Sequence, residues 1–369
     1  MMMSKKQMKR RSNEVRDWSS LPKLPLSFIS SQLDPISHVF FRSTCSAWRT
    51  FSPRPKFPLI ILANHTISKR YTSMAFFDID FNLLFRLPKC SFEFGSFFCG
   101  SSHGYLVFLD PASKLYLINP ITGHQIKLPK HNAQYRKNKK FIALHFQINL
   151  ALSAPPTDPQ CVFAAISRSQ NQVDVCKMRS ISWKTLLSDE CLFRDIVFYK
   201  GYFYLCSKKA LYRLDLEANG GTGMIVNVPL ALPVLDSSKI DKAFYDKFLK
   251  KTYLVELSGY LHMVLMYYES GKDSYYEFLK VNFEKERLEM IQLGIEDLMF
   301  LGISLGIGTN ARRYQGCSDE GMFLTKLAYD MEEPGVFCVE NSNIKCYLKE
   351  FHGIDQWDTL GWLAPNFSV

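Results

Sequence analysis

The clearest pattern of apolar and polar positions lies in residues 100–129. A polar, glycine-containing approach leads into the apolar run 105–109, which Asp110-Pro111-Ala112-Ser113 then interrupts. Proline fixes φ at about −65° and has no N–H to donate, and Asp and Ser bond the local backbone, so this tetrapeptide predicts a turn. An apolar run at 115–118 follows, and after a second turn at 119–123 comes the stretch 125–128. The pattern predicts a β-meander of three short strands, which needs further partners because it cannot bury its own apolar faces.

Parts of this meander recur along the chain. Gly104-Tyr105-Leu106 is echoed by Gly201-Tyr202-Phe203 and by Gly259-Tyr260-Leu261. Gly104 and Gly201 are 97 residues apart, which fits two units at the ~40–50 residues per four-stranded blade of a β-propeller. Dividing about 310 residues by this period predicts six or seven blades. The last strands, about 335–348, are expected to close the ring against the first, because an open ring exposes strand edges.

Residues 17–51 show a helical period instead. Three apolar residues at i, i+3 and i+7 share one helical face: Leu26, Ile29 and Leu33. Pro25 suits the first turn of this helix, Asp34 precedes the proline that ends it, and a second apolar stripe runs from Ile36 to Trp48. The segment is shorter than the ~40 residues that usually hold together without help. Some of its apolar side chains must therefore be covered by the propeller or by a partner protein.

Composition excludes several classes of protein. The 369 residues are 47% hydrophobic and 14% aromatic, which argues against global disorder. No apolar run approaches the ~18 residues that a membrane span needs, and the charged N-terminus lacks the apolar segment of a secretory signal. We expect no membrane partner.

The formal net charge of +10 is concentrated in two stretches. Residues 5–11 supply five Lys and Arg, and residues 127–140 supply six. Without those eleven, the 45 basic residues fall to 34 against 35 acidic ones, so the body of the protein is nearly neutral. Residues 1–16 are expected to be a disordered basic tail, either an import or nucleic-acid signal or a merely solvated terminus. The 127–140 stretch is expected to be a solvated loop.

Candidate chemistry finds little support. Ten cysteines without a secretory signal predict free thiols, and the fifteen-residue spacing of Cys161, Cys176, Cys191 and Cys206 is not a zinc spacing. Gly306–Ala311 matches a dinucleotide fingerprint in letters, but the residues after it do not predict the required helix. We expect no catalytic residue, no metal and no cofactor.

Residues 17–51 resemble an F-box. The motif positions are Leu21-Pro22, then Leu26, Ile29 and Leu33, then Phe41-Arg42-Ser43-Thr44-Cys45-Ser46-Ala47-Trp48-Arg49. Leu24 and Pro25 replace the acidic residue and leucine usual in that family, and His38 stands near its usual Asp. Residues 100–129 resemble the signature blade of plant F-box proteins that carry a KIB-type, kelch-like propeller. The two resemblances together cover about residues 17–365.

The resemblance implies a fold class of a small helical F-box followed by an all-β propeller of six or seven blades. Its domains would be a tail at 1–16, an F-box at 17–51, a linker at 52–58 and a propeller at 59–369. It also implies a non-catalytic subunit of an SCF-type ubiquitin ligase, nuclear or cytoplasmic, in which the propeller binds a target protein. The residues expected to dock a Skp-family adaptor, and through it a cullin scaffold, or to support that docking, are Leu21, Pro22, Leu26, Ile29, Leu33, Val39, Phe41 and Trp48.

Two other functions stay open. The departures at Leu24, Pro25 and His38 favour a propeller that works without a ligase, for example by blocking a kinase or tethering a nuclear factor. Binding of nucleic acid through the basic stretches is less expected and would weaken steeply with salt. Tyrosines on loops at one end of the ring would suit a protein-binding face. Most of the tyrosines in the later part of the chain are instead expected to lie in the core between blades, and the sequence does not distinguish the two sets among Tyr202, Tyr204, Tyr260, Tyr267, Tyr268, Tyr275 and Tyr276.

Overall fold

The chain forms two compact units, Met1–Pro55 and Lys56–Val369, in a computed structural model. The residues that the structure describes are 17–51, 59–65, 71–78, 83–86, 96–131, 148–167, 171–187, 192–208, 210–221, 223–231, 249–267, 275–292, 297–302, 306–310, 321–326, 335–340, 343–346 and 358–363. The expected tail at 1–16, the expected linker at 52–58 and most of the basic stretch 127–140 lie outside them.

The first unit is helical. Its elements are η1 (Trp18–Ser20), α1 (Lys23–Ser31), α2 (Pro35–Ser43) and α3 (Ser46–Phe51). The start of α2 is well determined, because the Asp34 carboxylate accepts the backbone N–H groups of Ile36 and Ser37 and Pro35 occupies the first turn. The second predicted helix is thus two helices, because the chain leaves α2 at Thr44 and starts α3 at Ser46.

The second unit is built from β-sheets, whose strands are grouped here by sheet. The first sheet holds β25 (Asp358–Leu363), β1 (Leu59–His65), β2 (Tyr71–Asp78) and β3 (Leu83–Phe85). The second holds β4 (Phe97–Ser102), β5 (Tyr105–Leu109), β6 (Lys114–Ile118) and β7 (Gln125–Lys130). The third holds β8 (Ile148–Leu152), β9 (Val162–Ser167), β10 (Gln172–Lys177) and β11 (Lys184–Leu187).

The remaining strands form three more sheets. The fourth holds β12 (Asp195–Tyr199), β13 (Tyr202–Cys206), β14 (Leu211–Asp215) and β15 (Met224–Val228), with the short α5 (Ala218–Gly221) between the last two. The fifth holds β16 (Leu249–Leu257), β17 (Tyr260–Tyr267), β18 (Tyr275–Asn282) and β19 (Arg287–Ile291). The last holds β20 (Asp297–Leu301), β21 (Gly306–Asn310), β22 (Gly321–Lys326), β23 (Gly335–Glu340) and β24 (Asn343–Cys346).

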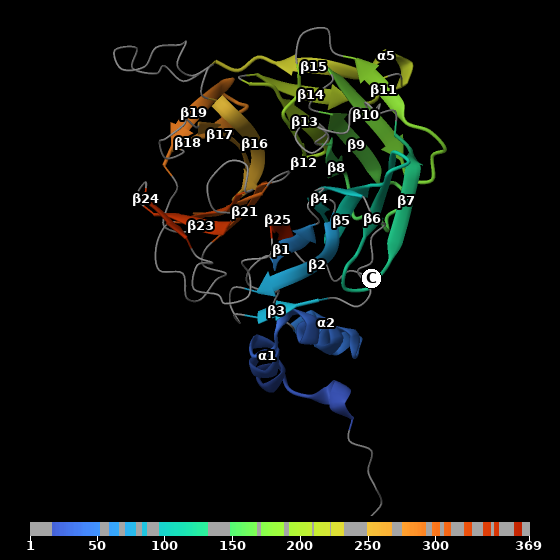
Figure 1. Cartoon of the computed structure of the whole chain (residues 1–369), viewed down its shortest axis with the longest axis vertical. Coiled ribbons are helices and arrows are strands. Elements are labelled where there is room, and N and C mark those ends of the chain that lie inside the picture. The colour runs from blue at the N-terminus through green and yellow to red at the C-terminus, as the bar shows by residue number, and fades with distance from the viewer. Residues whose placement is uncertain are drawn as a thin grey trace, which may run out of the picture. The chain divides into compact units, whose positions relative to one another are not determined.

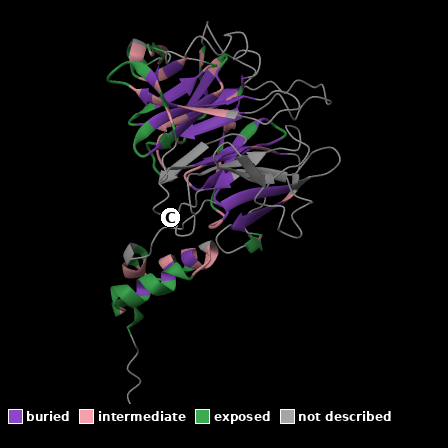
Figure 2. Ribbon diagram, turned by 90° about the vertical axis from the view of Figure 1, so that its left-hand side faces the viewer, coloured by how far each residue is buried: buried purple, intermediate pink, exposed green. Residues whose placement is uncertain are grey.

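These sheets follow one another around a ring, as a β-propeller requires (Figure 1). Neighbouring sheets contact through β25, β4, β8, β12 and β16 in that order; β16 then contacts β21, and β22 contacts β25. Strands such as β5 and β8 are buried along their whole length, because a neighbouring sheet covers each face. Figure 2 shows this difference between the units: the strands are mostly buried, and much of the helical unit is exposed.

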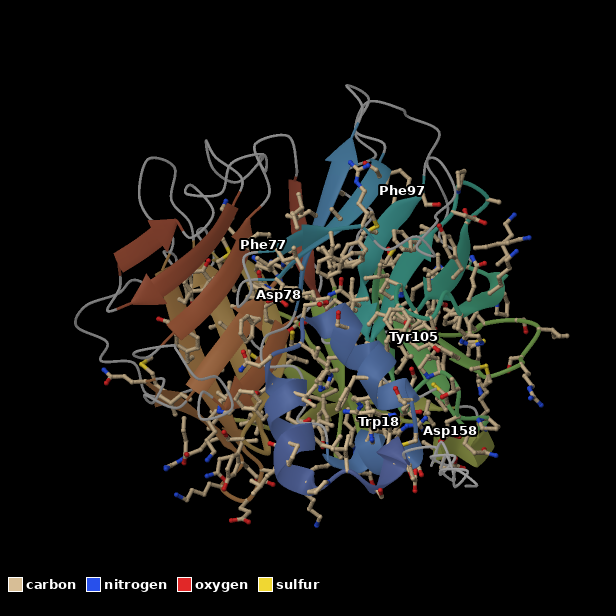
Figure 3. The ribbon with its side chains drawn as sticks, turned by 90° about the horizontal axis from the view of Figure 1, so that it is seen from below. Trp18, Phe77, Asp78, Phe97, Tyr105 and Asp158 are labelled. Carbon is tan, nitrogen blue, oxygen red and sulfur yellow. The ribbon has the colours of Figure 1, made fainter. Side chains whose placement is uncertain are left out.

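The predicted meander is confirmed in the second sheet. The expected strands correspond to β5, β6 and β7, with Leu106 opposite Ile118 and Ile118 opposite Gln125. The turn at 110–113 forms as expected, since the Asp110 carboxylate accepts the backbone N–H of Lys114 at 2.7 Å. Tyr105, labelled in Figure 3, is buried in this sheet.

The expectation of six or seven blades is wrong. Five blades have the regular four-stranded antiparallel form, and the remaining position in the ring is filled by a five-stranded sheet. In that sheet β20 pairs antiparallel with β21 and parallel with β22, so the chain does not simply run back and forth. Gly306 and Gly308 lie within strand β21, where they cannot form the turn of a dinucleotide fingerprint.

Ring closure was assigned to the wrong strands. Residues 335–348 contain β23 and β24, which pair inside the five-stranded sheet. The strand that joins the two ends of the propeller is β25, which pairs with β1 through Leu59 opposite Leu363 and Ile60 opposite Trp362. The physical reason for closure still holds, because this pairing supplies the free edge of β1 with a partner.

Candidate protein-interaction surfaces

Contacts between helices hold the first unit in shape. The buried side chains of Ser30 in α1 and His38 in α2 lie 2.9 Å apart, between Oγ and Nε2. The ring centroids of Phe41 and Trp48 are 4.5 Å apart, and the Trp48 indole N–H donates to the carbonyl of Trp18 at 3.0 Å. These contacts leave a rigid support on which other side chains of α1 and α2 face outward.

A carboxylate at the start of α2 is stabilised in its charged form. Burial alone would raise the pKa of Asp34, but hydrogen bonds from the Ser37 hydroxyl and from the N–H groups of Ser37 and Ile36 outweigh this effect and lower the pKa. The cap therefore keeps its negative charge at the positive end of the helix at neutral pH.

The structure divides the expected docking residues into three groups by exposure. Leu26 and Phe41 are buried, with 1% and 8% of their surface exposed, so they support the unit from inside. Pro22 and Ile29 are exposed. The others are half-buried: Leu21, Leu33, Val39 and Trp48. The stripe predicted from periodicity therefore runs from the interior at Leu26 to the surface at Ile29.

A surface that periodicity did not identify is more exposed. We define the α1 surface as Leu24, Phe28 and Ile29, which are 84%, 69% and 41% exposed. Leu24 and Phe28 are four residues apart and so share one face of the helix. This spacing can be found in the sequence without the structure. Two further aromatic residues of this unit are exposed: Phe40 in α2 and Trp18, which is labelled in Figure 3. Single exposed apolar residues are ordinary, but several on so small a unit make this surface a candidate for docking a partner.

The structure separates the seven tyrosines named above into core and surface residues. Tyr204 and Tyr267 are buried, and Tyr276 is half-buried. Tyr202 and Tyr260 are exposed, at 45% and 49%, and each directly follows the tight turn of a hairpin. Tyr268 and the side chain of Tyr275 lie outside the described part. The exposed pair comes from two neighbouring sheets, the fourth and the fifth.

The thiols that the structure describes pack as small apolar groups. Cys99, Cys161, Cys176 and Cys206 are buried and form no disulfide within the described part of the chain. Burial raises the pKa of Cys99 to about 12 and that of Cys176 to about 11. Among the described residues, no group of three or more His, Cys, Asp or Glu side chains could hold a metal ion. Within the same part of the chain, no helix is long and apolar enough to cross a membrane.

The match to a protein family agrees with this architecture. The family model described as KIB1-4 β-propeller matches residues 76–347. A probable F-box protein of Arabidopsis thaliana is 28% identical over 133 residues, which are 34% of this chain and 33% of that protein, so the match spans about a third of the relative's length. Among solved structures, an extracellular domain assigned to a one-component system of B. thetaiotaomicron aligns with a TM-score of 0.38 at 10% identity, over 79% of this chain and 34% of that one. The family match covers well over half of the sequence, and the chain belongs to the KIB1-4 β-propeller family.

Proposed function

We propose that the protein is a substrate-recruiting F-box subunit of an SCF-type ubiquitin ligase. The observation that carries this proposal is the α1 surface, a set of exposed apolar side chains on a small helical unit that precedes a KIB1-4 β-propeller. The partial match to a probable F-box protein supports it. The sequence motif around Leu21-Pro22 and Cys45-x-x-Trp48-Arg49 supports it as well.

In this proposal the two units have separate tasks. The helical unit docks a Skp-family adaptor, which connects it to a cullin scaffold, and the propeller holds a target protein. No residue of this chain needs to perform chemistry, because bringing the target close to the ubiquitin-charged enzyme raises the local concentration of the reacting groups. The protein would act in the nucleus or the cytoplasm.

The structure changes which residues the proposal relies on. Leu26 and Phe41 are buried, so they support the docking helices rather than contact the adaptor. The adaptor contacts are assigned to the α1 surface. Pro22, two residues before Leu24 in the sequence, and Phe40 of α2 are exposed as well. Large exposed apolar side chains favour binding because a partner that covers them removes their apolar area from water.

Co-purification with a Skp-family adaptor tests the proposal. The full chain should retain the adaptor, and a Leu24→Glu/Phe28→Glu variant should lose it, because two carboxylates would be placed in an apolar interface. Glutamate is a good helix former, so α1 itself should persist. Ser46→Glu is the matched control: it adds a charge at an exposed position in the first turn of α3, on another helix than the α1 surface.

The same experiment separates the proposal from its alternative. A folded full chain that ignores the adaptor would contradict the ligase function and would favour a propeller that binds its partner without a ligase. The departure at His38 favours that alternative, since this side chain is buried against Ser30 rather than presented as a charged group on the surface.

A further inference from the structure

A hydrogen bond joins two tight turns that belong to neighbouring blades of the propeller. Lys200-Gly201 connects β12 to β13, and Ser258-Gly259 connects β16 to β17. All four residues have positive φ, between 45° and 89°, as the two-residue hairpin turns that match strand twist require. The Tyr199 hydroxyl donates to the carbonyl of Gly259 at 2.7 Å. This bond crosses from the fourth sheet to the fifth and fixes the two turns relative to each other.

Aromatic rings form a continuous layer beside these turns. Buried Tyr199 and Tyr204 have centroids 6.1 Å apart, and Phe283, from the turn after β18, lies 5.3 Å from Tyr204 and stacks on Tyr199 at 6.2 Å. Phe283 is partly exposed, and Tyr202 and Tyr260 are exposed at the ends of the same hairpins. The buried rings therefore support the solvent-accessible Phe283, and Tyr202 and Tyr260 are two further exposed rings on the same hairpins.

Three cations lie over these rings. The Lys280 ammonium is 3.3 Å from the centroid of Tyr260, and the Arg213 guanidinium is 4.8 Å from that of Tyr202. The Lys200 ammonium is 5.0 Å from the Tyr199 ring and 6.0 Å from the Tyr260 ring. Such contacts hold a cation in place without neutralising its charge.

None of these cations forms a salt bridge within the described part of the chain, where the ion pairs found involve other residues. The Arg213 Nε is buried and has no hydrogen-bond acceptor there. One carboxylate, Glu256, acts on Lys200 electrostatically without pairing with it. The surface therefore carries a net positive charge, and its cations remain able to form ion pairs with the carboxylates of another molecule.

We infer that this aromatic–cationic surface, formed by Lys200, Tyr202, Arg213, Tyr260, Lys280 and Phe283, binds an acidic segment of a partner protein. Carboxylates would pair with the three cations, and the exposed rings would cover apolar side chains of the same segment. Tyr and Arg are the residue types that supply most of the energy in protein interfaces. Only the identification of that partner as a ligase target rests on the proposed function; binding itself does not.

The geometry favours a peptide over a nucleic acid. The rings of Tyr202 and Tyr260 already carry a cation on one face, which reduces the area on which a base could stack. The positive charge is also local, because the chain without its two basic stretches has 34 basic and 35 acidic residues. A surface that follows a phosphate backbone needs a longer basic stripe.

The test uses the full chain and a fluorescein-labelled octaglutamate peptide, followed by fluorescence anisotropy at low salt. We expect saturable binding, and a loss of affinity of about tenfold or more in Lys200→Glu/Lys280→Glu, because two attractions become repulsions. Lys114→Glu is the matched control, an exposed lysine of β6 in another sheet. It should change the affinity by less than about twofold. Tyr260→Ala should weaken binding without any change in charge.

Three results would overturn the inference: no binding of octaglutamate, equal binding by the double variant, or tighter binding of an octauridine RNA than of the peptide. Thermal unfolding of each variant shows whether the propeller remains intact. The α1 surface is not changed in any of these variants. Failure here therefore leaves the adaptor experiment unaffected, and failure of adaptor binding leaves this surface to be judged by its own result.

Discussion

Trp48 connects two parts of the helical unit through different atoms. Its ring packs on Phe41, and its indole N–H reaches the carbonyl of Trp18, thirty residues earlier. Trp18 contributes a backbone atom to this contact while its own side chain is exposed. Trp48 is therefore a structural residue of the unit, and its effect on adaptor binding would be indirect.

Trp48→Phe should loosen the helical unit alone. The ring contact with Phe41 can persist, but one hydrogen bond worth about 1 kcal/mol is lost, so hydrogen exchange in residues 17–51 should become about fivefold faster. Exchange in the propeller should not change. Trp18→Phe is the control, because it keeps the accepting carbonyl. Equal exchange in wild type and Trp48→Phe would show that the bond contributes nothing.

Thiol reactivity should follow burial. Burial raises the pKa of Cys99 to about 12 and that of Cys176 to about 11, so almost no thiolate exists at neutral pH. Native alkylation with iodoacetamide, followed by mass spectrometry, should modify the half-buried Cys45 well before either of them. Modification of Cys99 at the same rate as Cys45 would contradict the buried environment.

Periodicity predicted which apolar residues share one face of a helix but not which of them are exposed to solvent. Leu26 and Ile29 share a stripe, yet the first is buried and the second is 41% exposed. The difference arises because α2 and α3 cover only part of that stripe. The spacing of apolar residues within one helix does not determine where other helices pack on it. Leu24 and Phe28 were overlooked for the same reason, since their spacing is equally helical.

A buried polar cluster links the second and third sheets at the level of whole elements. His131, directly after β7, lies 2.9 Å from the Asp174 carboxylate of β10, measured from Nε2 to Oδ2. The Thr185 hydroxyl of β11 donates to the other carboxylate oxygen. Trp183 packs edge-on against the His131 ring, and its indole N–H donates to the carbonyl of Pro129. Two blades are therefore joined by polar as well as apolar contacts.

Asp174→Asn should destabilise the propeller by about 3 kcal/mol at neutral pH, because it breaks a buried pair. Urea unfolding measures this difference. Asp158→Asn is the control: Asp158, labelled in Figure 3, accepts the N–H of Gln160 at an exposed turn, and asparagine can accept it too. Similar losses in both variants would show that the cluster has no special role.

The same cluster predicts a dependence on pH. Burial alone would raise the pKa of Asp174, but hydrogen bonds from His131 and Thr185 outweigh it and lower the pKa below the ordinary 3.8. A lowered pKa in the folded state means that the charged form stabilises the protein above 3.8 and that this contribution is lost as the pH falls through the folded value. The stability difference between wild type and Asp174→Asn should therefore shrink below that pH. A constant difference would contradict the assignment.

Closure of the ring depends on Trp362 at the scale of the whole propeller. Its ring lies 4.8 Å from that of Phe300 in β20, and its indole N–H donates to the Leu301 carbonyl at 3.3 Å. Its own carbonyl accepts the Ser101 hydroxyl of β4. Through β25, one buried residue thus connects the first, second and five-stranded sheets.

Trp362→Ala should cost about 3–5 kcal/mol, the range for removing a large buried aromatic side chain. Chemical unfolding of the full chain measures it. Trp18→Ala removes the same side chain from an exposed position and should change propeller stability little. A loss below about 1 kcal/mol for Trp362→Ala would show that β25 is not needed to hold the ring.

The sequence predicted the propeller but not how it closes. Repeated Gly-Tyr turns fixed the period, and the strands around them formed as expected. The blade count failed because residues 297–346 do not follow that period: β20 takes two partners, one of them parallel. Closure was placed too early because the alternation of Leu360 and Trp362, which marks β25, occurs only near the C-terminus. The spacing of apolar residues within a short stretch does not predict which distant strands pair with each other.

A titration of the full chain with a purified Skp-family adaptor tests the central claim most directly. We predict saturable binding for the wild type and for Ser46→Glu. For Leu24→Glu/Phe28→Glu we predict a loss of about thirtyfold or more, which corresponds to about 2 kcal/mol at a dominant contact. Absence of binding by a folded wild type, or equal binding by the double variant, would contradict the assignment of the α1 surface as the ligase-docking site.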